Sequence, residues 1–141
     1  MQNKVCIYDL ALLLNRIIFG TYIVFGHGWG KLERLLDGNI QFSSVFGLPP
    51  VVNLILAIFA EVLCGIALIL GFRTRWVSIP LIATMLVAAF VVHGSDPFFI
   101  AKAGSGGSKE LAVLFLAGFL TSLLLGSGRY SLDFILYRKK N

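Results

Sequence analysis

The sequence predicts an all-α fold: an integral membrane bundle of four transmembrane helices, with the N- and C-termini both in the cytoplasm. Three observations favour this fold class. The chain has 141 residues, of which 57% are hydrophobic and only 13% charged, and its mean hydropathy is +0.87. A soluble domain of this size needs a larger polar share to cover its surface. In addition, four apolar runs each approach the ~20 residues that cross a bilayer, and basic residues gather in alternate connections.

The first transmembrane helix is expected at about residues 10–27. Asp9 and Arg16 interrupt this apolar run and no small-x-small cleavage site follows it, so we interpret it as a retained helix rather than a signal peptide. Residues 31–50 mix leucine, isoleucine and phenylalanine with charges and glycines. This pattern predicts an amphipathic outer segment that lies on the membrane surface between the first two helices.

The other three helices are expected at about residues 51–72, 76–93 and 110–127. Each apolar run is too long for a buried strand, and the hydrocarbon region does not tolerate backbone groups without hydrogen-bond partners. The connections are short, which predicts antiparallel neighbours in one bundle. Residues 1–141 therefore form a single transmembrane domain, with no room for a separate soluble module.

The orientation follows from the distribution of Lys and Arg. Basic residues occur in the N-terminal tail, in the connection between the second and third helices, and in the C-terminal tail. They are Lys4, Arg73, Arg75, Arg129, Arg138, Lys139 and Lys140. Because cytoplasmic segments carry the excess of basic residues, these three segments are predicted to be cytoplasmic and the other two loops to face outward.

Composition also excludes several classes of function. The net charge is +5, but no basic face with interleaved aromatics occurs, so nucleic-acid binding is not expected. Cys6 and Cys64 form no CxxC motif and share no ligand spacing with histidine, which argues against a disulfide or a zinc site. The two histidines also lack the spacing of a metal site. The glycines of residues 26–30 follow a membrane helix, not a strand, so a dinucleotide-binding fingerprint is rejected.

Two ionisable residues lie well inside apolar runs. Arg16 is about six residues into the first helix and Glu61 about ten residues into the second, which runs the opposite way. At ~1.5 Å per residue their depths differ by only several ångströms, so a direct or water-bridged ion pair is expected, because an unpaired charge in lipid is costly. Such a pair could fix helix packing, or it could form a polar pocket that holds a ligand or passes protons.

A second polar group is predicted at the outer end of the bundle, where His27, Lys31, His93 and Glu110 converge. Histidine titrates near neutral pH, which suits proton exchange with a redox carrier whose reduction takes up protons. Two simpler interpretations remain open. The histidines could be ordinary interfacial residues, and Glu110 could complement the N-terminus of its helix.

Several local motifs resemble one known family. They are Arg16 with Phe19-Gly20, Gly26-His27-Gly28-Trp29-Gly30-Lys31-Leu32, Glu61, Gly65, Leu70-Gly71, Arg73-Thr74-Arg75, His93, Glu110 and Gly126-x-Gly128-Arg129-Tyr130-Ser131-Leu132-Asp133. Together they resemble the DoxX family of small four-helix bacterial membrane proteins, and the resemblance covers nearly the whole chain. It implies a multi-pass protein of the bacterial cytoplasmic (inner) membrane.

The resemblance also implies quinone-linked redox chemistry. Members of the family include a membrane subunit associated with thiosulfate:quinone oxidoreductase, proteins linked to quinone or catechol stress, and a mycobacterial protein that assembles with a superoxide dismutase and a sulfurtransferase. Arg16, Glu61, His93 and Glu110 carry over as family-like polar positions. The chain has no cysteine pair, haem-ligand pair or flavin motif. This favours a subunit of a membrane oxidoreductase over an autonomous enzyme.

The leading hypothesis is therefore a membrane component of a quinone-linked oxidoreductase system that binds a quinone in the bundle. Arg16 and Glu61 would hold the polar interior, and the outer group would contact the headgroup. An alternative is a non-catalytic anchor or assembly protein that recruits a soluble redox enzyme at the cytoplasmic face. A weaker alternative is a small-molecule transporter, which would need a homo-oligomer to build a pathway. No covalent or metal cofactor is expected.

Overall fold

A computed structural model describes residues 7–99 and 107–138, and these residues form helices and no strand. Lys4, Cys6, Lys139 and Lys140 lie outside the described residues. In chain order, with η marking π-helical segments, the elements are α1 (Ile7–Thr21), η1 (Tyr22–Gly28), α2 (Trp29–Leu36), α3 (Pro50–Ile58), η2 (Phe59–Cys64), α4 (Gly65–Leu70), α5 (Thr74–Val87), η3 (Ala88–Val92), α6 (Glu110–Leu125) and α7 (Leu132–Arg138).

The first long helix is continuous from Ile7 to Leu36 and contains α1, η1 and α2. The prediction that it ends near residue 27 was wrong by nine residues. Glycine weakens helices in water, but Gly28 lies in close contact with Glu61 and Val62 of the second helix, so its missing side chain allows tight packing. The helix stops at Gly38 (φ +70°), where Gly38 N–H donates to Leu35 and Asn39 N–H to Arg34, a Schellman ending.

The predicted amphipathic segment begins inside this helix. In α2, Leu32 and Leu35 pack against a cluster formed by Leu54, Ile58 and Val62, whereas Glu33 and Arg34 between them are exposed. The chain from residue 37 to residue 49 then has no regular helix. Phe42 in this stretch joins the same cluster, so the outer segment is held to α3 by apolar contacts.

The remaining long helices follow the prediction closely. The second runs from Pro50 to Leu70 and the third from Thr74 to Val92. With the first, they make three helices in the described residues that are long and apolar enough to cross a membrane. α6 has 16 residues, about 24 Å at 1.5 Å each, which is shorter than a ~30 Å hydrocarbon core. The fourth crossing and the cytoplasmic placement of the termini stay predictions.

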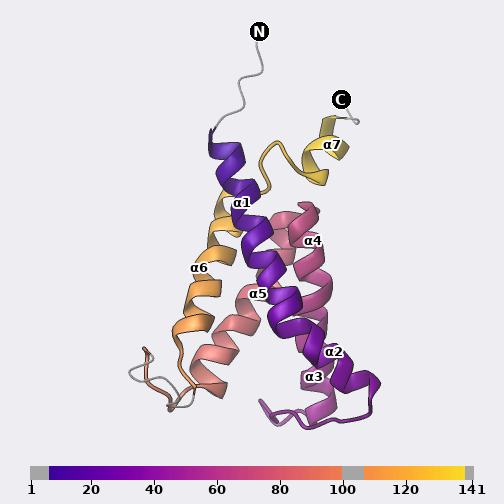
Figure 1. The fold of residues 1–141 in the computed structure, drawn as a ribbon, viewed down its shortest axis with the longest axis vertical. Coiled ribbons are helices and arrows are strands. Elements are labelled where there is room, and N and C mark those ends of the chain that lie inside the picture. Colours follow the sequence, from indigo (N-terminus) through magenta and orange to yellow (C-terminus); the bar gives the residue numbers. More distant parts are fainter. Residues whose placement is uncertain (1–6, 100–106, 139–141) are drawn as a thin grey trace.

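The four long helices form a bundle in which sequence neighbours run antiparallel (Figure 1). α1 packs against α4 and α6, and α5 packs against α4, η2 and α6. Figure 1 shows that α7 and the start of α1 lie at one end of the bundle, and α2 and α3 at the other. We call these the α7 end and the α2 end; the basic residues predict that the α7 end is cytoplasmic.

Apolar side chains form both the interior and much of the surface. The main core contains Ile23, Val24, Cys64, Leu68, Leu81, Met85, Ala89, Ala112, Phe115 and Phe119. Many large apolar side chains on the same helices point outward and are exposed, such as Phe25, Leu63 and Leu124. A water-soluble bundle would place polar residues there, so the surface is suited to lipid.

Glycines bring the helices close together. A Cβ atom at Gly20 would lie 2.5 Å from Ile69 Cγ1, and one at Gly65 would lie 2.6 Å from Val24 Cγ2. A Cβ atom at Gly118 of α6 would lie 2.5 Å from the ring of Phe19. Small residues at such contacts are typical of membrane helix packing, where close backbone approach provides the van der Waals energy. These contacts fix the depth of each helix and thereby the position of its polar residues.

Candidate functional site

Arg16 is fully buried, with 0% of its surface exposed, and it lies at the α7 end. Its Nη1 donates to the carbonyl oxygens of Ile69 at 3.2 Å and Leu68 at 3.4 Å, and its Nη2 donates to Tyr130 O at 2.5 Å. Leu68 and Ile69 are in the last turn of α4, where helix carbonyls run out of partners within the helix; Leu68 O also accepts from Gly71 N–H at 3.0 Å. The guanidinium thus caps the negative end of a helix dipole.

The turn between α4 and α5 is shaped around this guanidinium. Gly71 has φ +68°, and a Cβ atom there would lie 2.9 Å from Arg16 Cζ and 2.5 Å from Ser131 Cβ. Asp133 accepts hydrogen bonds from the N–H groups of Arg73 at 2.7 Å and Thr74 at 3.1 Å. It thereby caps the N-terminus of α5 from a distant part of the chain.

The start of α1 is tied to the same region. Asp9, which is 7% exposed, accepts a hydrogen bond from Arg129 N–H at 3.0 Å, and its other carboxylate oxygen lies 3.6 Å from Arg129 Nε. Ser131 accepts from Phe134 N–H at 3.2 Å and so provides the N-cap of α7. Residues 127–133 comprise the loop before α7 and the first two residues of that helix; we call them the C-terminal loop, and they connect α1, α4 and α5.

The predicted ion pair between Arg16 and Glu61 was wrong. Arg16 is level with Ile69, and Glu61 is eight residues away from Ile69 on the same helix, which is about 12 Å at 1.5 Å per residue. The error comes from the first helix, because the predicted end near residue 27 was treated as level with the start of the second helix. In the structure, residues 29–36 continue beside α3, so the two helices are offset by about nine residues.

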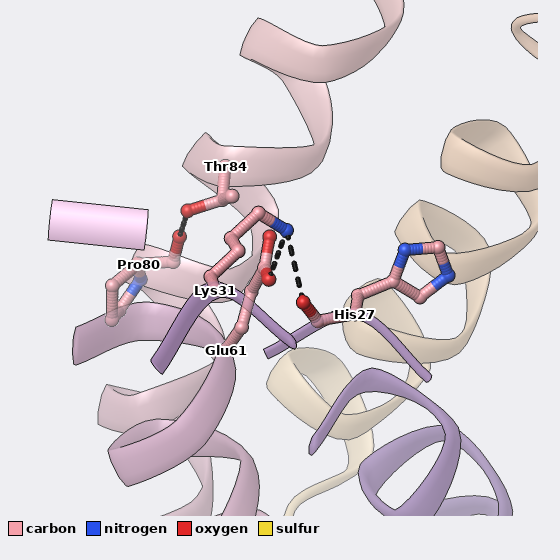
Figure 2. A network of polar contacts seen from close by, with 5 residues as sticks. All are labelled: His27, Lys31, Glu61, Pro80 and Thr84. Carbon is pink, nitrogen blue, oxygen red and sulfur yellow. Dashed lines mark hydrogen bonds and ion pairs between the residues drawn. The ribbon is translucent and has the colours of Figure 1, made fainter. Parts of the chain in front are cut away.

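Glu61 instead pairs with Lys31. Lys31 Nζ lies 2.5 Å from Glu61 Oε2 and donates a second hydrogen bond to the carbonyl oxygen of His27 at 3.3 Å. Figure 2 shows the ammonium group between these two acceptors. The side chain of Glu61 is 4% exposed and that of Lys31 is 20% exposed. The pair is thus a nearly buried carboxylate bound to a cation that still reaches the surface.

π-helical geometry occurs where these residues lie. His27 is in η1 and Glu61 in η2, and these two segments pack against each other. η3 ends directly before His93. A π-helical segment holds an extra residue per turn, is uncommon, and occurs often at functional sites. The three segments are therefore a second indication, independent of charge, that this part of the bundle is specialised.

His27 faces a cluster of aromatic rings. Its imidazole lies 5.4 Å from the ring of Phe115 at 88°, an edge-on contact. Phe115 stacks on Phe119 at 5.8 Å, and Phe19 meets both rings edge-on at 6.0 and 6.4 Å. In Figure 2 the ring of His27 points away from Lys31 and Glu61. Arg16 faces α4 and His27 faces α6, so the two side chains lie on different sides of the first long helix.

The end of α5 and the start of α6 also lie at the α2 end (Figure 1), and His93 directly follows η3 after α5. His93 Nδ1 lies 2.7 Å from Asp96 Oδ2, and both side chains are about one third exposed. Glu110 is the first residue of α6. Of the predicted candidates, the structure brings together Lys31, Glu61 and the backbone carbonyl of His27 within the described residues. It shows no group of three His, Cys, Asp or Glu side chains arranged for a metal ion within those ranges.

Sequence reasoning missed several residues around these groups. Asp133 and Asp9 looked like ordinary polar residues near helix ends, and their partners are 59 and 120 residues away. Phe115 and Phe119 are spaced by four residues, a signal for a shared helix face, but that spacing is common in any core. Nothing in the amino-acid sequence indicated the three π-helical segments.

The Lys31–Glu61 site has spare hydrogen-bonding groups. Lys31 Nζ carries three protons, and two are used by Glu61 and His27. Neither ring nitrogen of His27 has a partner in the described ranges, although the residue is half-buried. The site therefore offers a cation, an imidazole and a nearby carboxylate, close to aromatic rings and to a lipid-facing surface. These groups suit a small molecule with carbonyl or hydroxyl oxygens on a flat ring.

Comparisons with known proteins agree with this architecture. The DoxX family model matches residues 11–94, which include Arg16, Lys31, Glu61 and His93. The chain is also similar to the inner membrane protein YqjF of Escherichia coli (strain K12), with 30% identity over 131 residues, 93% of this chain and 95% of that protein. No solved structure matches it. The chain belongs to the DoxX family, and it is a multi-pass inner membrane protein.

Proposed function

We propose that the chain is the membrane component of a quinone-linked oxidoreductase system and that a quinone headgroup binds at the Lys31–Glu61 pair. The observation that carries the proposal is the pair itself, a nearly buried carboxylate 2.5 Å from an ammonium group. The headgroup would lie between the pair and the aromatic cluster. Lys31 would donate its unused hydrogen bond to one quinone oxygen, and the ring of His27, which points away from the pair, would donate to the other. The phenylalanines next to His27 would contact the flat face of the ring.

The site also supplies protons. Reduction of a quinone to a quinol takes up two electrons and two protons, and the Lys31–Glu61 pair and His27 are groups able to exchange them. The proposal assigns the electrons to a partner oxidoreductase that docks at the α2 end, where the Lys31–Glu61 pair lies. The exposed apolar faces of the long helices allow the isoprenoid tail to remain in lipid while the headgroup reaches the pair.

Quinone retention by the purified protein tests the proposal. The full chain is purified in mild detergent, saturated with a short-tailed ubiquinone, washed, and the quinone per chain is quantified. In the parent we expect retention close to one per chain. In Glu61→Gln and Lys31→Met we expect affinity to fall by about tenfold or more, because a hydrogen bond involving a charged group contributes about 1.5–3 kcal/mol.

Arg34→Met is the matched control, since Arg34 is exposed on the same helix as Lys31 and its guanidinium lies outside the pair. Retention equal in the parent and in both site variants would contradict the proposal. Absence of quinone from a folded parent would also contradict it and would favour the non-catalytic anchor.

A further inference from the structure

A pocket lies at the α7 end, away from the Lys31–Glu61 pair. It has a volume of about 280 Å³ and forms between the start of α5 and the turn after α6. Its lining includes Arg73, Thr74, Arg75, Trp76, Ser127 and Asp133. Because these residues come from both the α4–α5 turn and the C-terminal loop, the pocket exists only when that loop is docked.

The lining carries a net positive charge. Arg73 and Arg75 contribute two guanidinium groups against the single carboxylate of Asp133, and both arginines are exposed. The carboxylate is already used, since it accepts the N–H groups of Arg73 and Thr74. Arg75 Nη2 makes one long contact, 3.4 Å to Leu124 O. Both guanidinium groups therefore keep most of their donors for an anion.

Ser127 donates to Ser131 Oγ at 3.1 Å, since the single proton of Ser131 goes to Gly128 O at 2.7 Å. One buried hydroxyl group adds to the donors of the arginines. Thr74 is 1% exposed, and its Oγ1 has no partner in the described ranges. A buried hydroxyl without a partner is unusual in a folded protein. Next to two arginines, it indicates that an oxygen-rich ligand completes this pocket.

The position of the pocket indicates the source of the ligand. The Trp76 side chain lines the pocket and is 70% exposed, and Tyr130 on the adjoining loop is 44% exposed. Trp and Tyr favour the membrane interface, where lipid headgroups lie. We propose that this pocket binds the phosphate of an anionic phospholipid, held by Arg73 and Arg75, with its glycerol region against Trp76. Basic pockets between membrane helices at the cytoplasmic side bind such headgroups.

The test uses the full chain in detergent with short-chain phosphatidylglycerol as the anionic probe and short-chain phosphatidylcholine as the zwitterionic probe. Binding is measured by native mass spectrometry and by the shift in thermal unfolding. We expect the parent to prefer phosphatidylglycerol. In Arg75→Gln the affinity for phosphatidylglycerol should fall by about tenfold, as for loss of one charge-assisted contact, whereas phosphatidylcholine binding stays unchanged.

Arg34→Gln is the control, because it removes the same charge from an exposed helix position at the α2 end. Arg73→Gln is the second site variant and should also weaken binding. The guanidinium of Arg73 is exposed and makes no contact in the described ranges, so folding should not require it. Equal affinity for phosphatidylglycerol in the parent and in both folded site variants would overturn the proposal. Displacement of the lipid by millimolar inorganic phosphate would overturn the lipid source and assign the pocket to a soluble phosphate. If the parent does not prefer phosphatidylglycerol to phosphatidylcholine, the lipid proposal is overturned, and an acidic protein partner becomes the candidate ligand of the arginines.

Discussion

The two ends of the bundle each bury an ionisable side chain, and they treat it differently. At the α7 end, Arg16 is fully buried and bonded to three backbone carbonyl oxygens. At the α2 end, Glu61 is bonded to another side chain, Lys31, which is itself one fifth exposed. Backbone partners are fixed by the fold, whereas a flexible lysine can exchange its partner for a ligand. A charge inside an apolar run is therefore structural at one end and a candidate site at the other.

The largest effect is expected from Arg16→Met. This change leaves the partly buried carbonyls of Ile69 and Tyr130 without their donor, whereas Leu68 O keeps the N–H of Gly71. Each unsatisfied group costs about 1–3 kcal/mol. We expect the free energy of unfolding to fall by about 3 kcal/mol in total. The measurement is reversible unfolding in mixed detergent micelles, followed by circular dichroism. If the free energy of unfolding of Arg16→Met lies within about 1 kcal/mol of that of the parent, Arg16 does not have a structural role at the α7 end.

A double-mutant cycle on Lys31 and Glu61 gives the intermediate effect. Lys31→Met, Glu61→Gln and the double variant are unfolded under the same conditions, and we expect a coupling energy of about 1 kcal/mol. The value is smaller than for Arg16 because Lys31 can turn its ammonium group toward the interface when its partner is lost. A coupling energy near zero would mean that the short contact does not hold the two helices together.

The smallest effect is expected from Asp133→Asn. Asparagine has one acceptor oxygen where Asp133 uses two, so the variant keeps one of the hydrogen bonds to the N–H groups of Arg73 and Thr74 and loses the other. The site is partly exposed, so the expected loss is at the low end for a hydrogen bond, about 0.5 kcal/mol. The unfolding temperature should shift by about 1–2 °C. Glu33→Gln, which removes an exposed carboxylate from α2, is the matched control. If the unfolding temperature of Asp133→Asn falls by many degrees, Asp133 contributes more than Arg16 to the stability of the α7 end.

Much of the fold was predictable because apolar run length determines where membrane helices form. The expected helix at residues 51–72 runs from Pro50 to Leu70, and that at 76–93 runs from Thr74 to Val92. Composition alone does not determine how far a helix extends beyond its apolar run. Two contacts hold residues 29–36 as a helix beside the second long helix. Gly28 allows close approach to Glu61, and Lys31 pairs with the carboxylate of Glu61. Both contacts form only in the folded bundle.

The candidate site was predictable in its residues but not in its pairs. Lys31, Glu61 and His27 were all singled out from the sequence, since ionisable residues near lipid need a partner. The wrong partner for Glu61 followed from the wrong helix end, because an offset of nine residues moves a side chain by more than 10 Å. The three π-helical segments also alter which way each side chain points, and periodicity at 100° per residue does not include them.

The contacts of Arg16 have a consequence for the order in which the protein is made. Tyr130 follows Arg16 by 114 residues, and Arg129 follows Asp9 by 120. At 5–20 residues per second, a ribosome needs roughly 6 to 24 seconds to make that stretch. The carbonyls of Leu68 and Ile69 are made earlier and can already accept from Nη1, but during the rest of this interval Nη2 depends on water or lipid phosphate for a hydrogen bond. A nascent chain that stalls before residue 129 therefore lacks both the contact to Tyr130 O and the tie between Asp9 and Arg129.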